Sequence, residues 1–288
     1  ILKAYMQWGN RFLEKLTGMF AFCIYDQKRN LLFLARDRVG EKPIYFYEDE
    51  NDFIFASELK ALLQDKAISR KFNLPMLEYY LTYGAVRGPE CLIAGVKKLL
   101  PGHALVYDIE KHQYRLFKYW DLPDQDHLHR SSDEDYVDEL ENLLQSSVSG
   151  QLVSDVPVGI LLSGGLDSSL ITAMAARASH QPISTFNVSF PGAVGFDESN
   201  FAKQIASHFG TRHQVLEVDS FTMTELDILA KQFDEPVGDQ AIIPTYLISK
   251  VISNEAKVAL SGDGGDELFA GYSHYSWIKK QALLRQRT

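Results

Sequence analysis

The sequence predicts an α/β protein in which an antiparallel α+β region precedes a doubly wound parallel sheet. Three observations lead to this prediction. Short apolar segments separated by turn dipeptides fill residues 1–120, which is typical of an antiparallel sheet. From residue 134 onward, apolar strands alternate with segments of helical periodicity, which is typical of parallel βαβ units. One strand of this second region ends in a glycine- and hydroxyl-rich loop, residues 163–169, that opens a helix.

Composition excludes several classes of protein. The 288 residues are 45% hydrophobic and 23% charged, as expected of a globular chain with room for two domains. The formal net charge of −9 argues against a general nucleic-acid-binding surface, which needs clustered Lys and Arg. Cys23 and Cys91 form no C-x-x-C pattern, so zinc and dithiol redox sites are not predicted. No apolar run is long enough to cross a membrane and no signal peptide is recognisable, so we expect a cytoplasmic location.

The first region begins with a helical pattern and continues with a β-hairpin. We expect Ser57 to cap a helix. Arg36, Asp37 and Lys42 are expected to order a loop, and His103, after a Pro-Gly turn, to make a local hydrogen bond. The predicted strands cover residues 18–26, 31–37, 44–47, 53–56, 104–108 and 114–120, and the predicted helices cover 57–63 and 75–81.

A polar segment without periodicity, residues 121–133, separates the two regions, so we predict domains over 1–122 and 134–288. Apolar residues then recur at helical spacing from Tyr136 to Leu144. The predicted strands that follow are 158–162, 183–190, 213–218 and 256–260, and the predicted helices include 198–209, 221–233 and 243–253.

The loop at 163–169 is typical of an anion site. A strand that ends at the N-terminus of a helix directs free backbone N–H groups and the positive end of the helix dipole to one point. Phosphate suits that point. Asp167 within the loop makes sense if a divalent cation lies between its carboxylate and the phosphate.

Two further polar loops follow predicted strands, at residues 196–199 and 261–267. Since the carboxyl ends of parallel strands face one crevice, we expect the acidic residues of these loops to converge on the phosphate site, which predicts bound ATP and Mg²⁺. Helix N-capping is the alternative role for several of them. The expected group is Asp167, Asp263, Asp266 and Glu267, and the capping alternative applies to Asp197, Asp263, Asp266 and Glu267.

Asp234, Glu235 and Asp239 surround Pro236. Their spacing fits two roles, either shaping the loop around this proline or acting in the site. The sequence alone leaves both open.

The loop contains neither the Walker A nor the G-x-G-x-x-G pattern. Ser163-Gly164-Gly165-Leu166-Asp167-Ser168 instead resembles the pyrophosphate-binding loop S-G-G-x-D-S, whose enzymes adenylate a carboxylate or carbonyl. Together with ordered matches elsewhere, the chain resembles a glutamine-hydrolysing asparagine synthetase of the bacterial B type. The matching segments are residues 18–22, 35–43, 55–62, 99–103, 119–120, 163–169, 196–198, 234–236 and 261–267.

This resemblance implies a pyrophosphate-loop ATPase fold for the second region and the later part of an N-terminal-nucleophile (class II) glutaminase domain for the first. It implies that aspartate attacks the α-phosphorus of ATP to give a β-aspartyl-AMP and pyrophosphate. Ammonia from glutamine then displaces AMP. A homodimer is compatible with this resemblance. The implied residues are Ser163, Gly164, Gly165, Asp167, Ser168 and Ser169 for pyrophosphate, Asp167 and Asp266 for Mg²⁺, Leu161, Val188, Ser261 and Gly262 for adenosine, and Asp263 for catalysis.

The sequence also departs from the family pattern. Asp263 stands where Glu is frequent, which keeps open another acceptor carboxylate, as in β-lactam-forming or sugar- and peptide-amidating homologues. A nucleotide-binding homologue without catalysis is a third reading. Ala270 replaces a usual Gly. Ile1 cannot serve as the N-terminal cysteine nucleophile, so we expect a fragment truncated at both ends that by itself lacks glutaminase activity.

Overall fold

The computed structural model describes residues 1–123, 132–189, 198–218 and 221–285. The chain folds into two units. The first unit comprises Ile1–Leu128 and Met223–Asp239, and the second comprises His129–Thr222 and Gln240–Thr288. The segment 223–239 therefore belongs to the first unit, although residues of the second unit precede and follow it along the chain.

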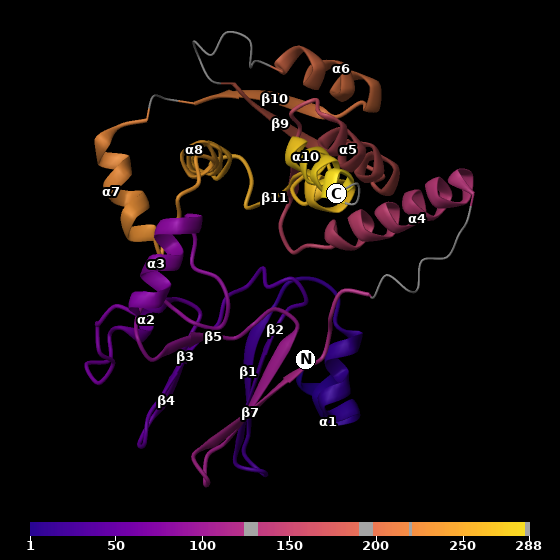
Figure 1. The fold of residues 1–288 in the computed structure, drawn as a ribbon. Coiled ribbons are helices and arrows are strands. Elements are labelled where there is room, and N and C mark those ends of the chain that lie inside the picture. Colours follow the sequence, from indigo (N-terminus) through magenta and orange to yellow (C-terminus); the bar gives the residue numbers. More distant parts are fainter. Residues whose placement is uncertain (124–131, 190–197, 219–220, 286–288) are drawn as a thin grey trace. The chain divides into compact units, whose positions relative to one another are not determined.

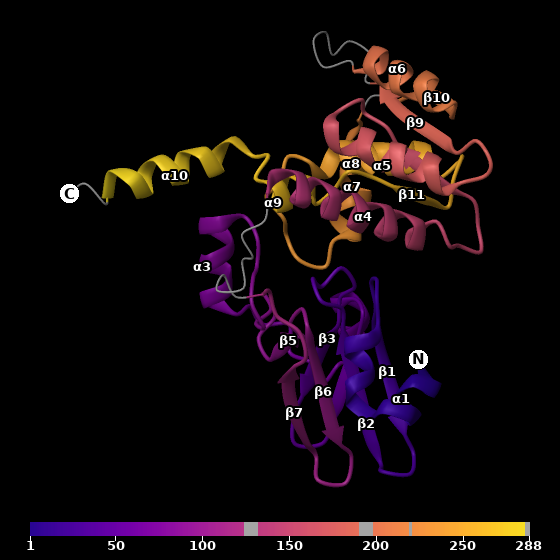
Figure 2. The same ribbon diagram turned by 90° about the vertical axis from the view of Figure 1, so that its right-hand side faces the viewer.

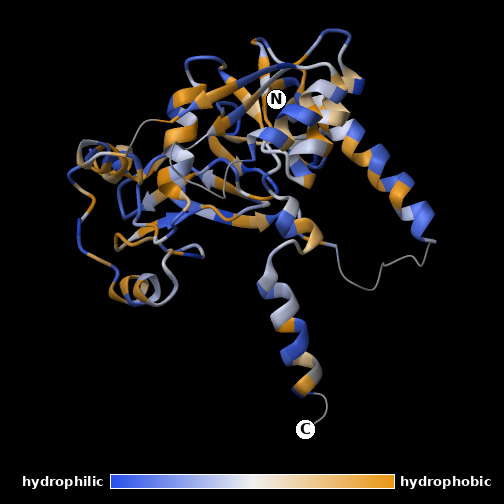
Figure 3. Cartoon of the chain, turned by 90° about the horizontal axis from the view of Figure 1, so that it is seen from above, coloured by the Kyte–Doolittle hydropathy of each residue, from blue (hydrophilic) through white to orange (hydrophobic). Residues whose placement is uncertain are grey.

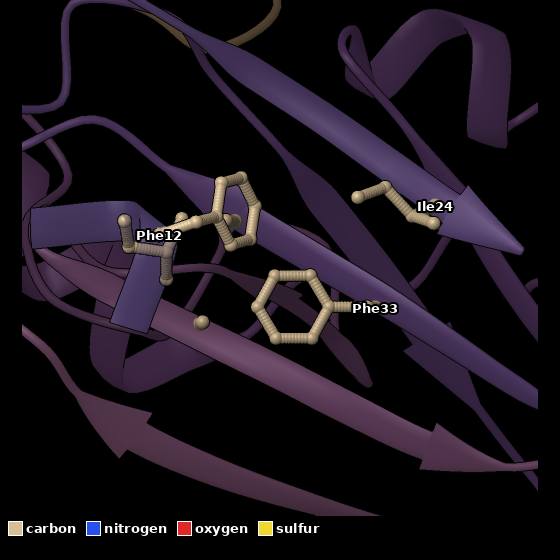
Figure 4. Close-up of a cluster of buried hydrophobic side chains, with 6 residues drawn as sticks. Phe12, Ile24 and Phe33 are labelled. Carbon is tan, nitrogen blue, oxygen red and sulfur yellow. The ribbon is translucent and has the colours of Figure 1, made fainter. Parts of the chain in front are cut away.

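The first unit is built on a four-stranded antiparallel sheet with the order β1-β2-β6-β7 (Figure 2). Its N-terminal segment is helical, as predicted, but tightens from an α-helix into a 3-10 helix at Gly9. Phe12 of that segment packs with Ile24 and Phe33 of the sheet in a buried cluster (Figure 4). The elements are α1 (Leu2–Trp8), η1 (Gly9–Lys15), β1 (Ala21–Asp26), β2 (Leu31–Arg36), β6 (His103–Asp108) and β7 (Gln113–Lys118).

A second, three-stranded antiparallel sheet has the order β4-β3-β5, formed by β3 (Tyr45–Glu48), β4 (Phe53–Ala56) and β5 (Val96–Lys98). The first two strands were predicted. Strand β5 was not predicted, because a strand of three residues is too short to show an alternation of apolar and polar positions. Phe46 of β3 and Leu105 of β6 are buried in one cluster, so the two sheets share a core.

The loop after β2 is ordered by Arg36 and Asp37, which confirms that prediction. The Asp37 carboxylate is buried and accepts hydrogen bonds from the backbone N–H groups of Gly40, Glu41 and Lys42 at 2.7–2.9 Å. The Arg36 guanidinium donates to three backbone carbonyls, including Leu99 O at 2.8 Å. The predicted local bond of His103 is also present, since its Nδ1 lies 2.7 Å from Pro101 O.

The helices of the first unit are α2 (Leu59–Leu62), α3 (Leu74–Tyr83) and α7 (Met223–Gln232). The prediction that Ser57 caps α2 is wrong. The N-cap residue is Glu58, which makes no side-chain capping bond. The backbone N–H groups of Leu59 and Lys60 instead donate to the Asp234 carboxylate, at 2.8 and 3.2 Å. A residue far along the chain thus supplies the cap that the local sequence does not.

The second unit contains a four-stranded sheet with the order β10-β9-β8-β11, and Figure 1 labels β9, β10 and β11. All neighbouring strands are parallel, which confirms the predicted architecture. The chain moves outward from β8 to β9 and β10 and then returns to place β11 on the other side of β8. The direction of winding therefore reverses between β8 and β11, where ligands bind in open α/β sheets. The strands are β8 (Val158–Leu161), β9 (Ser184–Ser189), β10 (Arg212–Glu217) and β11 (Val258–Leu260).

Helices of the second unit pack on one another and on the sheet. Helix α4 packs on α5, and α6 lies along β9 and β10 (Figure 1). A capping box between Ser132 and Asp135 begins α4, along which hydrophobic and hydrophilic residues alternate (Figure 3). None of the helices in the described ranges is long and apolar enough to span a membrane. They are α4 (Asp133–Gln151), α5 (Leu166–Ala178), α6 (Ser199–Phe209), α8 (Ile242–Ile252), α9 (Gly265–Phe269) and α10 (Ser273–Arg285).

Candidate functional site

The loop after β8 makes the strand-to-helix turn that its glycines predict. Gly164 has φ +90°, a conformation that L side chains rarely adopt. A Cβ at this position would also lie 2.6 Å from Phe201 Cβ and 2.7 Å from Ala202 N. Only glycine allows the loop to lie this close to α6, so the position of the loop depends on that helix.

Hydroxyl groups inside the loop fix its backbone. The buried Ser168 Oγ accepts from Ser163 N at 3.3 Å and lies 3.0 Å from Ser163 Oγ. Ser163 Oγ in turn accepts from Gly165 N at 3.2 Å, and Ser169 Oγ donates to Gly165 O at 2.6 Å. The turn is therefore held in one shape by Ser163, Ser168 and Ser169.

Helix α5 begins with N–H groups that have no intrahelical acceptor. Its N-cap is Gly165, and no side chain caps the helix. The first turn therefore presents backbone donors and the positive end of a 13-residue helix dipole beside the loop. This arrangement favours an anion, and phosphate is the anion that such helix starts commonly bind.

The loop after β11 lies against Asp167. A Cβ on Gly262 would lie 2.9 Å from Asp167 Cβ and 3.0 Å from Ser168 N, and a Cβ on Gly265 would lie 2.6 Å from Asp167 Oδ2. Both glycines therefore permit contact between the two loops. Within the second loop, Ser261 Oγ donates to Asp263 Oδ2 at 2.8 Å. The carboxylates of Asp167 and Asp263 are thus held by neighbouring loops at the switch between β8 and β11.

A hollow of about 630 Å³ lies between these two loops and helix α8. This volume is in the range of small-molecule sites, about 300–1,000 Å³. Its wall combines hydroxyl and carboxylate groups from the loops with apolar side chains from the helix. The lining residues are Leu161, Ser163, Gly165, Leu166, Asp167, Ser168, Thr245, Ile248, Ser249, Ile252, Ser253, Ala256, Lys257, Ala259, Ser261, Gly262 and Asp263. A second hollow of about 100 Å³ shares Asp167 and Asp263 and adds leucine, isoleucine and phenylalanine side chains.

Most of the predicted site residues line the larger hollow, but some do not. Asp266 and Glu267 line neither hollow. The Asp266 carboxylate lies where a Cβ on Gly271 would be, and the Glu267 carboxylate accepts from Tyr272 Oη at 2.7 Å, which lowers the pKa of Glu267. Asp197 lies outside the described residues. The predicted residues that do not line the larger hollow are Gly164, Ser169, Val188, Asp266 and Glu267.

The sequence reasoning missed Asn187 as a support of the loop at 163–169. It placed Ser199 in a polar loop but did not predict that this residue also supports the loop at 163–169. Asn187 is buried in β9, and its Nδ2 donates to Leu162 O at 3.1 Å. Ser199 Oγ at the start of α6 donates to Asn187 Oδ1 at 2.7 Å. Asn is depleted in strands, so one asparagine inside an apolar strand was the available signal for a buried hydrogen bond.

Helix α8 was predicted as an element, but its contribution to the hollow was not. Thr245 and Ser249 stand one turn apart, as do Ile248 and Ile252, and these four residues form the wall on this side. The sequence signal that could have indicated this wall was the helical spacing of the two hydroxyl residues and of the two isoleucines.

The cysteines are not reactive nucleophiles. Burial raises the pKa of the Cys23 thiol to about 11 and that of Cys91 to about 12. Both are therefore neutral thiols at physiological pH, as a structural role requires. Among the described residues, no set of three or more His, Cys, Asp and Glu side chains gathers as a metal-ion site.

Comparison with known families agrees with this geometry. The model of the asparagine synthase family matches residues 139–287, and that of the glutamine amidotransferase domain matches residues 1–120. The first match covers the strand-loop-helix junction and the loop after β11.

Individual relatives extend the match over nearly the whole chain. A putative asparagine synthetase [glutamine-hydrolyzing] 2 of Methanocaldococcus jannaschii is 38% identical, over 94% of this chain and 53% of the relative. Asparagine synthetase [glutamine-hydrolyzing] 3 of Bacillus subtilis is 33% identical, over 94% of this chain and 46% of that protein. The amidase chyE of Penicillium rubens is 30% identical, over 96% of this chain and 43% of that protein. The chain spans about half the length of these curated relatives. On these matches, the chain belongs to the asparagine synthase family.

Proposed function

We propose that the second unit binds ATP in the hollow beside Asp167 and activates a carboxylate by adenylation. The observation that carries the proposal is the meeting of two glycine loops at Asp167, beside the uncapped start of α5. The N–H groups of α5 suit the β- and γ-phosphates, which leave together as pyrophosphate. The isoleucines of α8 offer an apolar wall for the adenine ring.

The residues present fit a magnesium ion bound with the nucleotide. Mg²⁺ takes one or two carboxylates together with phosphate oxygens. Asp167 supplies a carboxylate within the lining of the hollow, at the end of the loop that suits phosphate. We propose Asp167 as the first protein ligand. We propose Asp266 as the second from the resemblance to the family, although its carboxylate lies against Gly271 and does not line the hollow. The ion would supply neutralisation of the charge that builds up on the departing pyrophosphate.

The proposed acceptor is aspartate. Its side-chain carboxylate oxygen attacks the α-phosphorus and forms a β-aspartyl-AMP, while the bond to the β-phosphate oxygen breaks and releases pyrophosphate. Ammonia then attacks the activated carbonyl carbon, gives up a proton and displaces AMP, which leaves asparagine. The protein contributes mainly by position and by hydrogen bonds from the loop to the leaving pyrophosphate. We propose that Asp263, which lines the hollow, acts near the activated carboxylate.

We propose that the ammonia comes from glutamine in the whole protein, since residues 1–120 match a glutamine amidotransferase domain. Cytoplasmic location and a homodimeric state remain predictions.

A second candidate keeps the adenylation and changes the acceptor. Asp263 is one methylene shorter than the Glu that is frequent at this position, and Ser261 holds its carboxylate. A shorter, tethered carboxylate leaves more space for the acceptor. The relative named amidase chyE also keeps this candidate open.

Pyrophosphate release by the full-length protein separates these candidates. We expect release that depends on aspartate and is absent with a panel of other carboxylic acids. A full-length protein that ignores aspartate and responds to another carboxylate supports the second candidate and overturns the first.

ATP binding by this chain tests the site itself. Asp167→Ala and Asp266→Ala are expected to weaken binding of ATP with Mg²⁺, whereas Asp155→Ala removes an exposed carboxylate outside the lining and serves as the matched control. If both site variants bind ATP as the wild type does and no AMP forms, the protein only holds a nucleotide.

A further inference from the structure

Asp234 and Glu235, here called the acidic anchor, are held inside the first unit. Their side chains are 12% and 9% exposed. They follow α7, in the segment 223–239 that belongs to this unit. Carboxylates at this depth require hydrogen-bonding partners, because a buried charge without them is costly.

Asp234 is bound to the start of α2. Its Oδ2 accepts from Leu59 N at 2.8 Å and its Oδ1 from Lys60 N at 3.2 Å. The Lys60 ammonium lies 3.8 Å from the same carboxylate and donates to Gln232 O at 2.9 Å. The segment is thereby tied to α2 at Gln232 and at Asp234.

Glu235 is bound to β5 and to the segment before it. Its Oε1 accepts from Leu92 N at 2.7 Å and from Cys91 Sγ at 3.2 Å, and its Oε2 forms an ion pair with Lys98. The Lys98 side chain is only 14% exposed, so this pair is largely shielded from water. Shielded charged hydrogen bonds are stronger than those between exposed groups.

A backbone bond completes the attachment just before the segment ends. Gly238 N donates to Gly84 O at 2.6 Å, and a Cβ on Gly238 would lie 3.2 Å from Gly84 Cα. The first unit ends at Asp239, and α8 begins at Ile242. The N-terminal end of the helix that lines the hollow is therefore continuous with a chain segment fixed at three successive points.

We infer that Asp234 and Glu235 are positioning residues for the nucleotide hollow. By fixing the segment that enters α8, they hold the wall formed by Thr245 and Ile248 in its binding position. The inference rests on the proposed function only for the identity of the ligand.

Hydrogen exchange and ATP binding of the full 288-residue chain test this inference. The variants are Asp234→Asn and Glu235→Gln, which keep the side-chain shape and part of the hydrogen bonding. Asp227→Asn on α7 is the control, since it removes the same charge from an exposed position in the same segment. We expect amide exchange in α8 to quicken by about tenfold in the two variants, the factor given by loss of one charged hydrogen bond. The Kd for ATP with Mg²⁺ rises by a similar factor, and the control changes neither.

Each outcome decides the inference. If exchange quickens only in residues 57–62, 90–98 and 223–239 while α8 keeps its wild-type protection, the anchor serves the first unit alone and the inference is overturned. If the wild type binds no ATP, the proposed function fails, but the exchange of α8 still decides the role of the anchor. Should a single variant fail to fold, the other one provides the same comparison.

Discussion

Gly265→Ala gives the sharpest test of how the two loops hold Asp167. The added Cβ would lie 2.6 Å from Asp167 Oδ2, whereas ordinary contact begins at 3.4 Å, so the carboxylate must move by about 0.8 Å. Gly265 does not have a positive φ, so alanine fits its backbone. The clash is with the end of a flexible side chain, which can turn away.

The expected loss falls on binding, not on folding. Turning the Asp167 side chain off its preferred rotamer costs about 0.5–1.5 kcal/mol. Magnesium tolerates little displacement of its ligand oxygens, so the same movement would take the carboxylate of the proposed ligand Asp167 out of reach of the ion. Disturbing the support of a metal ligand typically lowers affinity by about 10–100-fold. We expect a loss of this size for ATP with Mg²⁺.

Titration calorimetry with and without Mg²⁺ measures the effect, and thermal unfolding measures the folding cost. Gly150→Ala is the matched control, because a Cβ there meets nothing within 4 Å and the site lies in helix α4. We expect a large loss for Gly265→Ala only when Mg²⁺ is present. Wild-type affinity in Mg²⁺, or an equal loss without it, would refute the placement of Asp167 as a metal ligand.

Three further predictions concern single residues. Ala270 has φ 58°, a left-handed conformation that glycine adopts more easily. Ala270→Gly should therefore raise the free energy of unfolding, measured by urea titration, by about 0.5–1 kcal/mol. A lower free energy of unfolding would contradict this prediction. Asn187→Ala removes two buried hydrogen bonds, so it should lower that free energy by about 1–3 kcal/mol and weaken ATP binding. An unchanged urea midpoint and an unchanged affinity for ATP would count against this prediction. Burial raises the pKa of Cys23 to about 11 and that of Cys91 to about 12. In the unfolded chain the thiols have a pKa of about 8.5. Iodoacetamide at about pH 8 should therefore label the unfolded chain much faster than the native one. Equal labelling rates would show that the thiols are accessible and ionised.

The anchor settles one question that the sequence left open. Asp234 and Glu235 fitted both a loop-shaping role and a role in the site. In the structure they bind backbone and lysine groups of the first unit, and neither lines the larger hollow. They shape the segment 223–239, and we infer that through this segment they position the α8 wall of the larger hollow.

The sequence by itself determined the elements and the chemistry of the first loop. Strand, turn and helix at 158–178 follow from neighbouring residues, since a glycine at positive φ and hydroxyls within five positions encode the turn. The parallel sheet followed from the alternation of strands and helices, and the ordered motifs indicated the family.

Only the tertiary structure decided which groups meet. Asp234 caps α2 across 175 positions in place of Ser57, Asn187 supports a loop on a neighbouring strand, and α8 provides a wall of the hollow. Asp266 and Glu267 stand beside Asp263 in sequence, yet Asp263 lines the hollow and they do not. The physical reason is that local sequence fixes backbone geometry through short-range hydrogen bonds, whereas the partner of a side chain is selected by packing between segments far apart in the chain.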